Sequence, residues 1–340
     1  GWAIAYLFRT ASGAFDGVTS TGVVTIFSEL IADPERMLAW HTIFLVVTML
    51  VVAHGVRSGL ERAVRYVIPL LFLLLLLLLW HSSQTGESFA KGIHFLFYPD
   101  FSKLTAGGAL TAMGHAFFTL SLGMGAILTY GAYLPRQYSI TKTVSIIVVA
   151  DTLVSLLAGL VIFPLVFENN LAPNLGPGLI FQTLPIAFGY MVNGAFWGSL
   201  FFLMLIFTAW SSAIALIEPA VAWLVECKNF TRVRAAVWIG IIVWMLGIGT
   251  IFSFNIWASE SYQFRGMNLF DLLNYLASNI MLPLGGLFIA IFVGWSLNRS
   301  SSRDEMGDSW AYRIWFFMIR YLSPVALIVI FLHAVGAIKP

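Results

Sequence analysis

A glycine-rich stretch with two hydroxyl side chains lies in the middle of a membrane-length apolar segment. It reads Phe117-Phe118-Thr119-Leu120-Ser121-Leu122-Gly123-Met124-Gly125-Ala126. The bilayer core holds no water to satisfy loose backbone groups, so non-helical backbone is tolerated there only where it lines a cavity or is buried in protein. Glycine weakens the helix at this point, and Thr119 and Ser121 supply oxygens. The stretch predicts a broken membrane helix beside a binding site, although Gly-x-Gly also permits close helix packing.

A second polar stretch falls inside a later apolar segment. Thr208 lies three residues before Ser211 and four before Ser212, and Ala215 follows these serines by four and three residues, which gives a small polar stripe on a helix. Hydroxyl and carbonyl oxygens suit a hard cation such as sodium. Membrane serines also bond back to their own helix, which is the alternative for any single serine. Together the two stretches predict a cation and solute site near the middle of the membrane.

The composition defines a polytopic membrane protein. Hydrophobic residues make up 59% of the 340 residues and charged residues 10%, whereas soluble domains carry about 25% charged residues. The net charge of +2 does not indicate nucleic-acid binding, because the basic residues lie between apolar segments. The single cysteine excludes an internal disulfide, and the six histidines lack metal-ligand spacing. The sequence shows no catalytic triad, phosphate loop or paired catalytic carboxylates, which disfavours a membrane enzyme.

The apolar segments predict an all-α protein with eight full membrane spans and the tail of a ninth. The segments are 2–12, 37–56, 64–82, 108–134, 143–167, 195–225, 233–254, 269–297 and 311–336. The chain opens inside an apolar run without an initiator Met, so we expect that its N-terminus has been lost. Two long, partly apolar connections, 84–107 and 168–194, predict a lid packed into an outer vestibule, with an interfacial helix as the alternative.

The lysines and arginines of the loops predict the orientation of the chain. One set of short loops carries 11 of the 18 basic residues, and we expect this set in the cytoplasm. It consists of Arg57, Arg62, Arg65, Arg136, Lys142, Lys228, Arg232, Arg234, Arg299, Arg303 and Arg313. The alternate set carries six, including Lys339 at the C-terminus.

Two carboxylates fall within apolar segments. Asp151 lies near the start of segment 143–167, and an intramembrane carboxylate is a functional candidate by default. The alternative for Asp151 is a protonated group that hydrogen-bonds a neighbouring helix. Glu218 lies one or two helical turns after the hydroxyl stripe. It has three interpretations: a proton-linked group, a structural carboxylate, or a protonated carboxyl group.

The chain resembles the neurotransmitter:sodium symporters. The stretch 117–126 is similar to their broken sixth helix, 211–219 to their eighth, 151–164 to their seventh, and 176–185 to their fourth outer loop. The resemblance covers essentially the whole chain. It implies an all-α polytopic membrane protein with the five-plus-five inverted-repeat transporter fold. Helices 1, 2 and part of 3 would be lacking, and residues 1–340 would form a single transmembrane domain containing the rest of helix 3 and helices 4–11.

The resemblance implies sodium-coupled symport of an amino acid or related small amine by alternating access. The protein would be no enzyme and would need no cofactor beyond co-transported Na⁺. Its partners would be a small amino acid, sodium ions and the lipid bilayer, in a bacterial inner (plasma) membrane, without nucleic acid. A proton-coupled amino-acid transporter of the same architecture, using Asp151 or Glu218, is one alternative. A non-transporting receptor or a channel is an alternative from another class.

The resemblance also implies site residues. The substrate would contact Phe118, Thr119, Ser121, Met124 and Leu216. The first sodium site would use Thr119 and Asp151, and the second Thr208, Ser211 and Ser212. The gates would use Phe118 as a lid over the substrate, Asp271 or Asn274 on the outer side, and Glu226 on the cytoplasmic side.

Three positions depart from the family pattern. Met124 stands where a phenylalanine is common, Asp151 falls on a sodium-ligand asparagine, and Asn274 stands where the outer-gate aspartate is expected, with Asp271 one turn earlier. We expect no chloride requirement, because Asp151 would supply the negative charge beside sodium, although Ser155 is the residue type of chloride-dependent members. We also expect that residues 1–340 alone do not transport, because the first helix would complete both sodium shells.

Overall fold

The computed structural model describes residues 1–55, 61–135, 137–171, 176–307 and 309–338. Every regular element in these ranges is a helix, which confirms the all-α prediction. Arg57, Arg136 and Lys339, which entered the predicted orientation, lie outside the described residues. So does residue 56, the expected end of the first full span.

Seven unbroken helical segments in the described part of the chain are long and apolar enough to cross a membrane. They are α3 (Pro34–Ala53), α4 (Glu61–Ser83), α8 (Ile140–Glu168), α10 (Gly194–Lys228), α11 (Arg232–Phe252), the segment Leu269–Ser296 and the segment Trp310–Ala334. Each matches a predicted span, and α1 (Trp2–Ala11) matches the predicted partial one. The remaining predicted full span, 108–134, is not one helix, because it is interrupted at its glycines.

The described chain divides into two compact units. Unit 1 contains residues 1–98 and 154–270, and unit 2 contains residues 99–153 and 271–340. Helix α8 therefore contributes its first half to unit 2 and its second half to unit 1.

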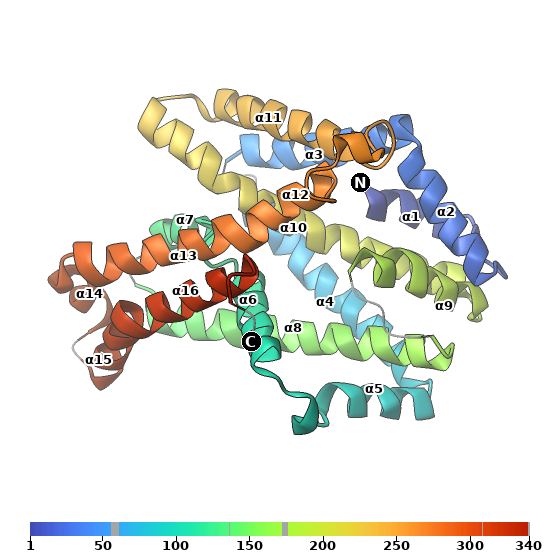
Figure 1. Cartoon of the computed structure of the whole chain (residues 1–340), viewed down its shortest axis with the longest axis horizontal. Coiled ribbons are helices and arrows are strands. Elements are labelled where there is room, and N and C mark those ends of the chain that lie inside the picture. The colour runs from blue at the N-terminus through green and yellow to red at the C-terminus, as the bar shows by residue number, and fades with distance from the viewer. Residues whose placement is uncertain (56–60, 136, 172–175, 308, 339–340) are drawn as a thin grey trace. The chain divides into compact units, whose positions relative to one another are not determined.

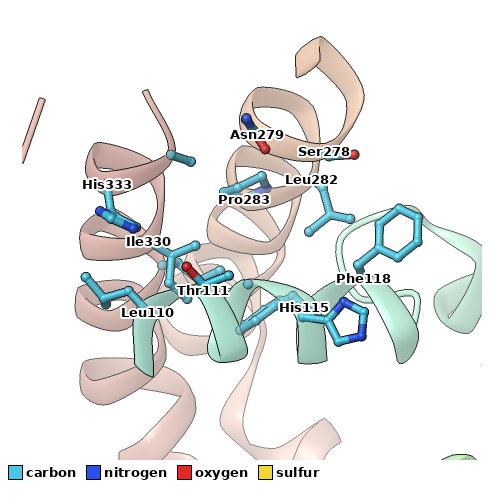
Figure 2. A pocket seen from close by; sticks show the side chains of 14 residues that line it. Leu110, Thr111, His115, Phe118, Ser278, Asn279, Leu282, Pro283, Ile330 and His333 are labelled. Atoms are coloured by element: carbon cyan, nitrogen blue, oxygen red, sulfur yellow. The ribbon is translucent and has the colours of Figure 1, made fainter. Parts of the chain in front are cut away.

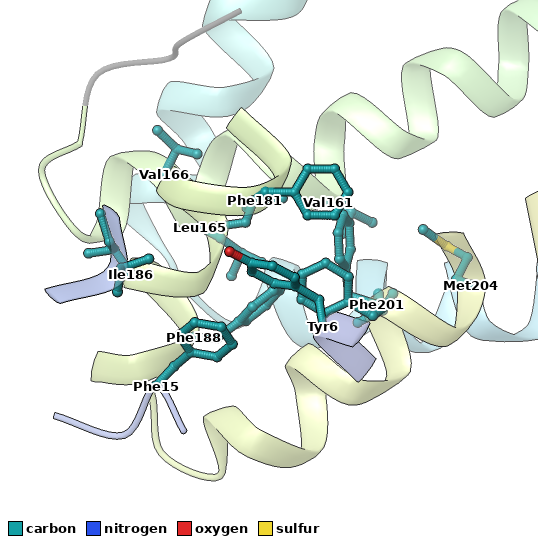
Figure 3. Close-up of a cluster of buried hydrophobic side chains, with 14 of the residues drawn as sticks. Tyr6, Phe15, Val161, Leu165, Val166, Phe181, Ile186, Phe188, Phe201 and Met204 are labelled. Carbon is teal, nitrogen blue, oxygen red and sulfur yellow. The ribbon is translucent and has the colours of Figure 1, made fainter. Parts of the chain in front are cut away.

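Unit 1 is built around an aromatic core. Helix α1 packs on α10, and α3 packs on α11 (Figure 1). Tyr6 on α1 is fully buried, with its ring centroid 5.3 Å from that of Phe15 and 5.1 Å from that of Phe181 (Figure 3). Phe181 belongs to η3 (Leu179–Thr183) and also packs beside Phe202 of α10. These ring contacts fix α1 and η3 on the long helix α10.

The connections of unit 1 are largely helical. Residues 168–194 contain η3 and α9 (Leu184–Tyr190), whose residues 184–188 are buried. This burial shows that α9 packs within unit 1, and the lid stays a prediction. The connection 84–107 contains α5 (Glu87–Phe97), where Gly92 is buried against Pro164 while Phe95 is 51% exposed. Helix α2 (Ser20–Ala32) was not predicted, because its 13 residues are too few to span a membrane.

Unit 2 contains the interrupted span and the last two membrane-length segments. The interrupted span consists of α6 (Ala106–Thr119) and α7 (Ala126–Tyr133). The segment from Leu269 consists of α12 (Leu269–Tyr275), η5 (Leu276–Met281), α13 (Leu282–Ile291) and η6 (Phe292–Ser296). After α14 (Arg299–Met306), the last segment consists of α15 (Trp310–Phe317), η7 (Met318–Leu322) and α16 (Ser323–Ala334). Helices α13 and α16 lie side by side, and α6 contacts both (Figure 1).

Proline explains three wide helical turns. The π-helical turns η3, η5 and η7 end two residues before Pro185, Pro283 and Pro324 respectively. Proline lacks an N–H and its ring pushes away the carbonyl four residues earlier. The preceding turn widens to accommodate both effects, so the helix continues without a break.

Candidate functional site

The interruption of the span in unit 2 is a change of backbone conformation confined to six residues. Helix α6 ends at Thr119, and α7 begins at Ala126. Between them Ser121, Gly123 and Gly125 have φ angles of 53°, 82° and 81°. Glycine adopts this left-handed region freely, whereas a non-glycine residue there is uncommon and often belongs to a functional site. The predicted helix break is therefore present at the predicted residues.

The break exposes backbone groups of both polarities. Backbone N–H groups donate to the carbonyls of Ala116, Phe117 and Phe118, which close the end of α6. In the part of the chain that the structure describes, the carbonyls of residues 119–124 accept no backbone hydrogen bond. The first N–H groups of α7 also lack intrahelical partners, as at any helix start. The break can thus present carbonyls to a cation and N–H groups to an anion.

Glycines on a neighbouring helix make room for the break. A Cβ added at Gly123 would lie 2.8 Å from the backbone nitrogen of Gly286 and closer still to the carbonyl oxygen of Leu282. A Cβ added at Gly285 would in turn collide with the carbonyl of Gly123. The broken segment is therefore seated directly on the backbone of α13, and only glycine fits at this contact.

Two cavities of unit 2 flank the broken helix. The larger, of about 530 Å³, lies between α6, the η5–α13 segment and α16. Phe118 and Leu282 both line this cavity (Figure 2). Its polar lining comes from Thr111, His115, Ser278, Asn279 and His333. The smaller, of about 360 Å³, is lined by Ser121, Gly123 and Gly125 of the break and by Gly286 and Ser323. The predicted lid residue Phe118 thus borders a cavity, with 51% of its surface exposed.

The residues assigned to the first sodium site lie on different elements of unit 2. Thr119 is the last residue of α6, and its hydroxyl donates to the carbonyl of Ala116 at 3.3 Å. Asp151 is partly buried on α8. Among the described residues, no hydrogen bond joins these two side chains. Met124, assigned to the substrate pocket, lies within the break and is partly buried.

The residues assigned to the second sodium site lie in unit 1 on the uninterrupted helix α10. The hydroxyl of Thr208 donates to the carbonyl of Met204 at 2.9 Å, and that of Ser211 to the carbonyl of Thr208 at 3.0 Å. Both therefore bond back to their own helix, as the alternative interpretation anticipated. Ser212 is exposed one residue further along. Leu216, assigned to the substrate pocket, is 50% exposed on the same helix.

The predicted gate residues lie at helix surfaces. Asp271 and Asn274 are exposed one turn apart on α12, and Ser278 donates to the Oδ1 of Asn274 at 3.5 Å. Glu226 is exposed in the last turns of α10. The exposure of Asp271 and Asn274 does not distinguish which of the two serves the outer gate.

Glu218 is part of a buried ion pair that the sequence did not reveal. Its side chain is fully buried, and Arg232 holds both oxygens, with Nη1–Oε1 at 3.0 Å and Nη2–Oε2 at 2.5 Å. The Nε of Arg232 also donates to the carbonyl of Val52 at 2.9 Å. The pair therefore joins α10, α11 and the end of α3. Of the three readings offered by the sequence, the geometry supports the structural carboxylate.

Replacing Arg232 with methionine is expected to lower the free energy of unfolding by about 3–5 kcal/mol, because the partner carboxylate stays buried and unpaired. Denaturant titration of the purified protein in detergent measures the loss. The matched control is Arg36→Gln, which removes the exposed Asp33–Arg36 pair and is expected to cost about 0–1 kcal/mol. Equal losses for the two variants would contradict the structural role of Glu218.

Comparison with known proteins identifies the family. The model of the sodium:neurotransmitter symporter family matches residues 23–340. The "Uncharacterized sodium-dependent transporter YhdH" of Bacillus subtilis is 34% identical, over 100% of this chain and 76% of its own. A sodium-dependent transporter of Haemophilus influenzae is 31% identical, over 98% of this chain and 74% of its own. "Sodium-dependent nutrient amino acid transporter 1" of Drosophila ananassae is 25% identical, over 87% of this chain and 46% of its own.

A solved structure agrees with these sequence relatives. The crystal structure of MhsT in complex with L-phenylalanine matches with a TM-score of 0.87 and 37% identity, over 98% of this chain and 76% of that chain. The chain therefore belongs to the sodium:neurotransmitter symporter family and has its transporter fold. It is a multi-pass membrane protein of a sodium-dependent transporter family, as the resemblance predicted.

Proposed function

We propose that this protein is a symporter that couples the uptake of an amino acid or related small amine to sodium by alternating access, and that it is not an enzyme. The observation that carries the proposal is the helix break of unit 2. Among the described residues, the carbonyls of 119–124 accept no backbone hydrogen bond, and those other than the Gly123 carbonyl, which packs on α13, are available to a cation or an ammonium group. The start of α7 is available to a carboxylate. A zwitterionic amino acid with sodium uses both sets of groups.

The relatives support the substrate class. One is named as a nutrient amino acid transporter, and another was solved with L-phenylalanine. In this proposal Phe118, Thr119, Ser121, Met124 and Leu216 contact the amino acid. Thr119 and Asp151 bind one sodium ion, and Thr208, Ser211 and Ser212 bind the other. The similarity to bacterial transporters also supports placement in a bacterial plasma membrane.

The buried ion pair weakens the proton-coupled alternative. Arg232 donates a hydrogen bond to each oxygen of Glu218, so both oxygens that could take a proton already have a fixed donor. A group that carries protons must instead release and take them during each cycle. Glu218 therefore does not fit a proton carrier, which leaves Asp151 as the carboxylate that the alternative requires.

Uptake into liposomes tests the proposed function. The protein is reconstituted, and uptake of a panel of labelled amino acids is measured with an inward sodium, choline or proton gradient. We expect sodium alone to drive uptake. Uptake driven by protons and not by sodium would reject the proposal.

One variant tests the second sodium site within the same assay. Loss of one oxygen ligand in Ser212→Ala is expected to raise the half-saturating sodium concentration about tenfold, the equivalent of about 1.4 kcal/mol. The control is Ser199→Ala on the same helix, since the Ser199 hydroxyl bonds back to Ala195 at 2.6 Å and lies outside the polar stripe. An unchanged sodium dependence in Ser212→Ala would remove this residue from the site.

A further inference from the structure

One arginine lies inside the last membrane-length segment. Arg320 belongs to η7, within the span Trp310–Ala334. Charged side chains within membrane helices are rare and are almost always paired, so a partner is expected. The Nε of Arg320 is buried without a hydrogen-bond partner. Within the ranges that the structure describes, no carboxylate forms an ion pair with this guanidinium.

Aromatic rings surround this cation. The guanidinium carbon of Arg320 lies 5.6 Å from the ring centroid of Trp295, 5.8 Å from that of Phe316 and 5.7 Å from that of Tyr321. Ring faces attract the positive charge but are weak partners for its five N–H donors. These three rings form an aromatic cage that holds the guanidinium in place. The N–H donors of Arg320 remain available to an anion.

A second arginine shares the cage. Arg299 is the first residue of α14, and its guanidinium carbon lies 4.7 Å from the centroid of the same Phe316 ring. It likewise forms no ion pair with the carboxylates that the structure describes. Both guanidinium groups thus contact the ring of Phe316, Arg299 as an exposed residue and Arg320 as a partly buried one.

The cage of Trp295, Phe316 and Tyr321 lies close to the end of the neighbouring membrane-length segment. An added Cβ on Gly294 would lie 3.1 Å from the Cα of Arg320, so the two backbones are at the same level. Gly294 comes two residues before Ser296, where the membrane-length segment ends. Two residues correspond to about 3 Å along a helix, and an arginine side chain bridges that depth by extending to the headgroups. Tryptophan and tyrosine are also typical of this interfacial layer.

From this geometry we propose that Arg320 and Arg299 bind the phosphate of an anionic phospholipid. The surface next to the site is apolar and open, because Phe317, whose ring centroid lies 5.5 Å from that of Tyr321, is 59% exposed, and Leu322, two residues after Arg320, is 53% exposed. Such a wall suits acyl chains, and the paired cations suit a phosphodiester with net negative charge. The loop that carries Arg299 is expected in the cytoplasm, where basic membrane pockets meet anionic lipids.

Native mass spectrometry of the delipidated protein tests this site. The protein is titrated with phosphatidylglycerol, with phosphatidylcholine and with inorganic phosphate. The double variant Arg320→Gln/Arg299→Gln is compared with Arg313→Gln, an exposed arginine of α15 with no ring contact in the cage. We expect wild type to prefer phosphatidylglycerol, the double variant to lose about fivefold in affinity for each arginine, and Arg313→Gln to keep the preference.

Three outcomes would overturn the proposal. They are unchanged phosphatidylglycerol binding by the double variant, equal binding of phosphatidylcholine by wild type, and displacement of the lipid by phosphate alone. Thermal unfolding of the wild-type protein provides a readout that needs no variant. Phosphatidylglycerol should raise the melting temperature more than phosphatidylcholine does, and equal effects of the two lipids would also reject the site.

Discussion

Replacing Gly123 with alanine is expected to abolish transport. The φ of 82° at this position costs an L-residue about 1–2 kcal/mol. The new methyl group would also press on the backbone of Leu282 and Gly286, which cannot rotate away as a side chain can. The broken segment must then move away from α13, and its carbonyls that accept no backbone hydrogen bond move with it. Because displacement of reacting groups by about 1 Å costs enzymes about 100-fold, we expect a loss of at least that size in sodium-driven uptake.

The matched control for this variant lies in the same interrupted span. Gly131 is inside α7, and nothing lies within 4 Å of a Cβ added there. Gly131→Ala is therefore expected to keep full uptake and to gain up to about 1 kcal/mol of helix stability. Uptake and thermal unfolding of both variants are measured together. Wild-type uptake by Gly123→Ala, or an equal loss in Gly131→Ala, would show that the seat on α13 does not position the break.

Replacing Asp151 with asparagine is expected to make uptake depend on chloride. In the proposed site Asp151 both ligates sodium and supplies a negative charge beside it. Asparagine keeps an oxygen ligand and removes the charge, so an external anion must replace it. Without chloride the variant site lacks any negative charge to attract sodium, so uptake in gluconate is expected to fall at least about tenfold, the equivalent of about 1.4 kcal/mol. Wild-type uptake should be the same in gluconate and chloride.

A neighbouring residue provides the control for Asp151. Thr152 is exposed on the same helix, and its hydroxyl bonds back to Val148 at 2.9 Å. Thr152→Ala should therefore leave both uptake and its independence of chloride unchanged. The interpretation fails if wild-type uptake falls to background without chloride, or if Asp151→Asn behaves like wild type in both anions.

The residues of the two sodium sites are assigned from the resemblance to the symporter family. Thr119 and Asp151 lie on separate elements, and Thr208 and Ser211 bond to their own helix. A hydroxyl in a helix has the same sequence pattern whether it binds an ion or its own backbone. The sequence therefore names candidates for these sites, and the variants above are what distinguish the two roles.

The membrane spans and the location of the helix break follow from the amino-acid sequence alone. Both are local properties, since hydropathy over about 20 residues defines a span. Glycines at 123 and 125 permit the left-handed backbone wherever the segment packs. The wide turns before Pro185, Pro283 and Pro324 are also local in cause, although the sequence analysis did not predict them.

The contacts between groups that are distant in sequence became visible only in the folded chain. Arg232 is fourteen residues beyond Glu218, on the next helix, and no helical periodicity pairs the two. The contact of Gly123 with Gly285 and the meeting of Arg299 and Arg320 at Phe316 likewise depend on how helices pack. The physical reason is that apolar segments in a bilayer have similar hydrophobicity on all sides. Their pairing is therefore set by backbone fit and by the pairing of buried charges, which become defined only in the assembled fold.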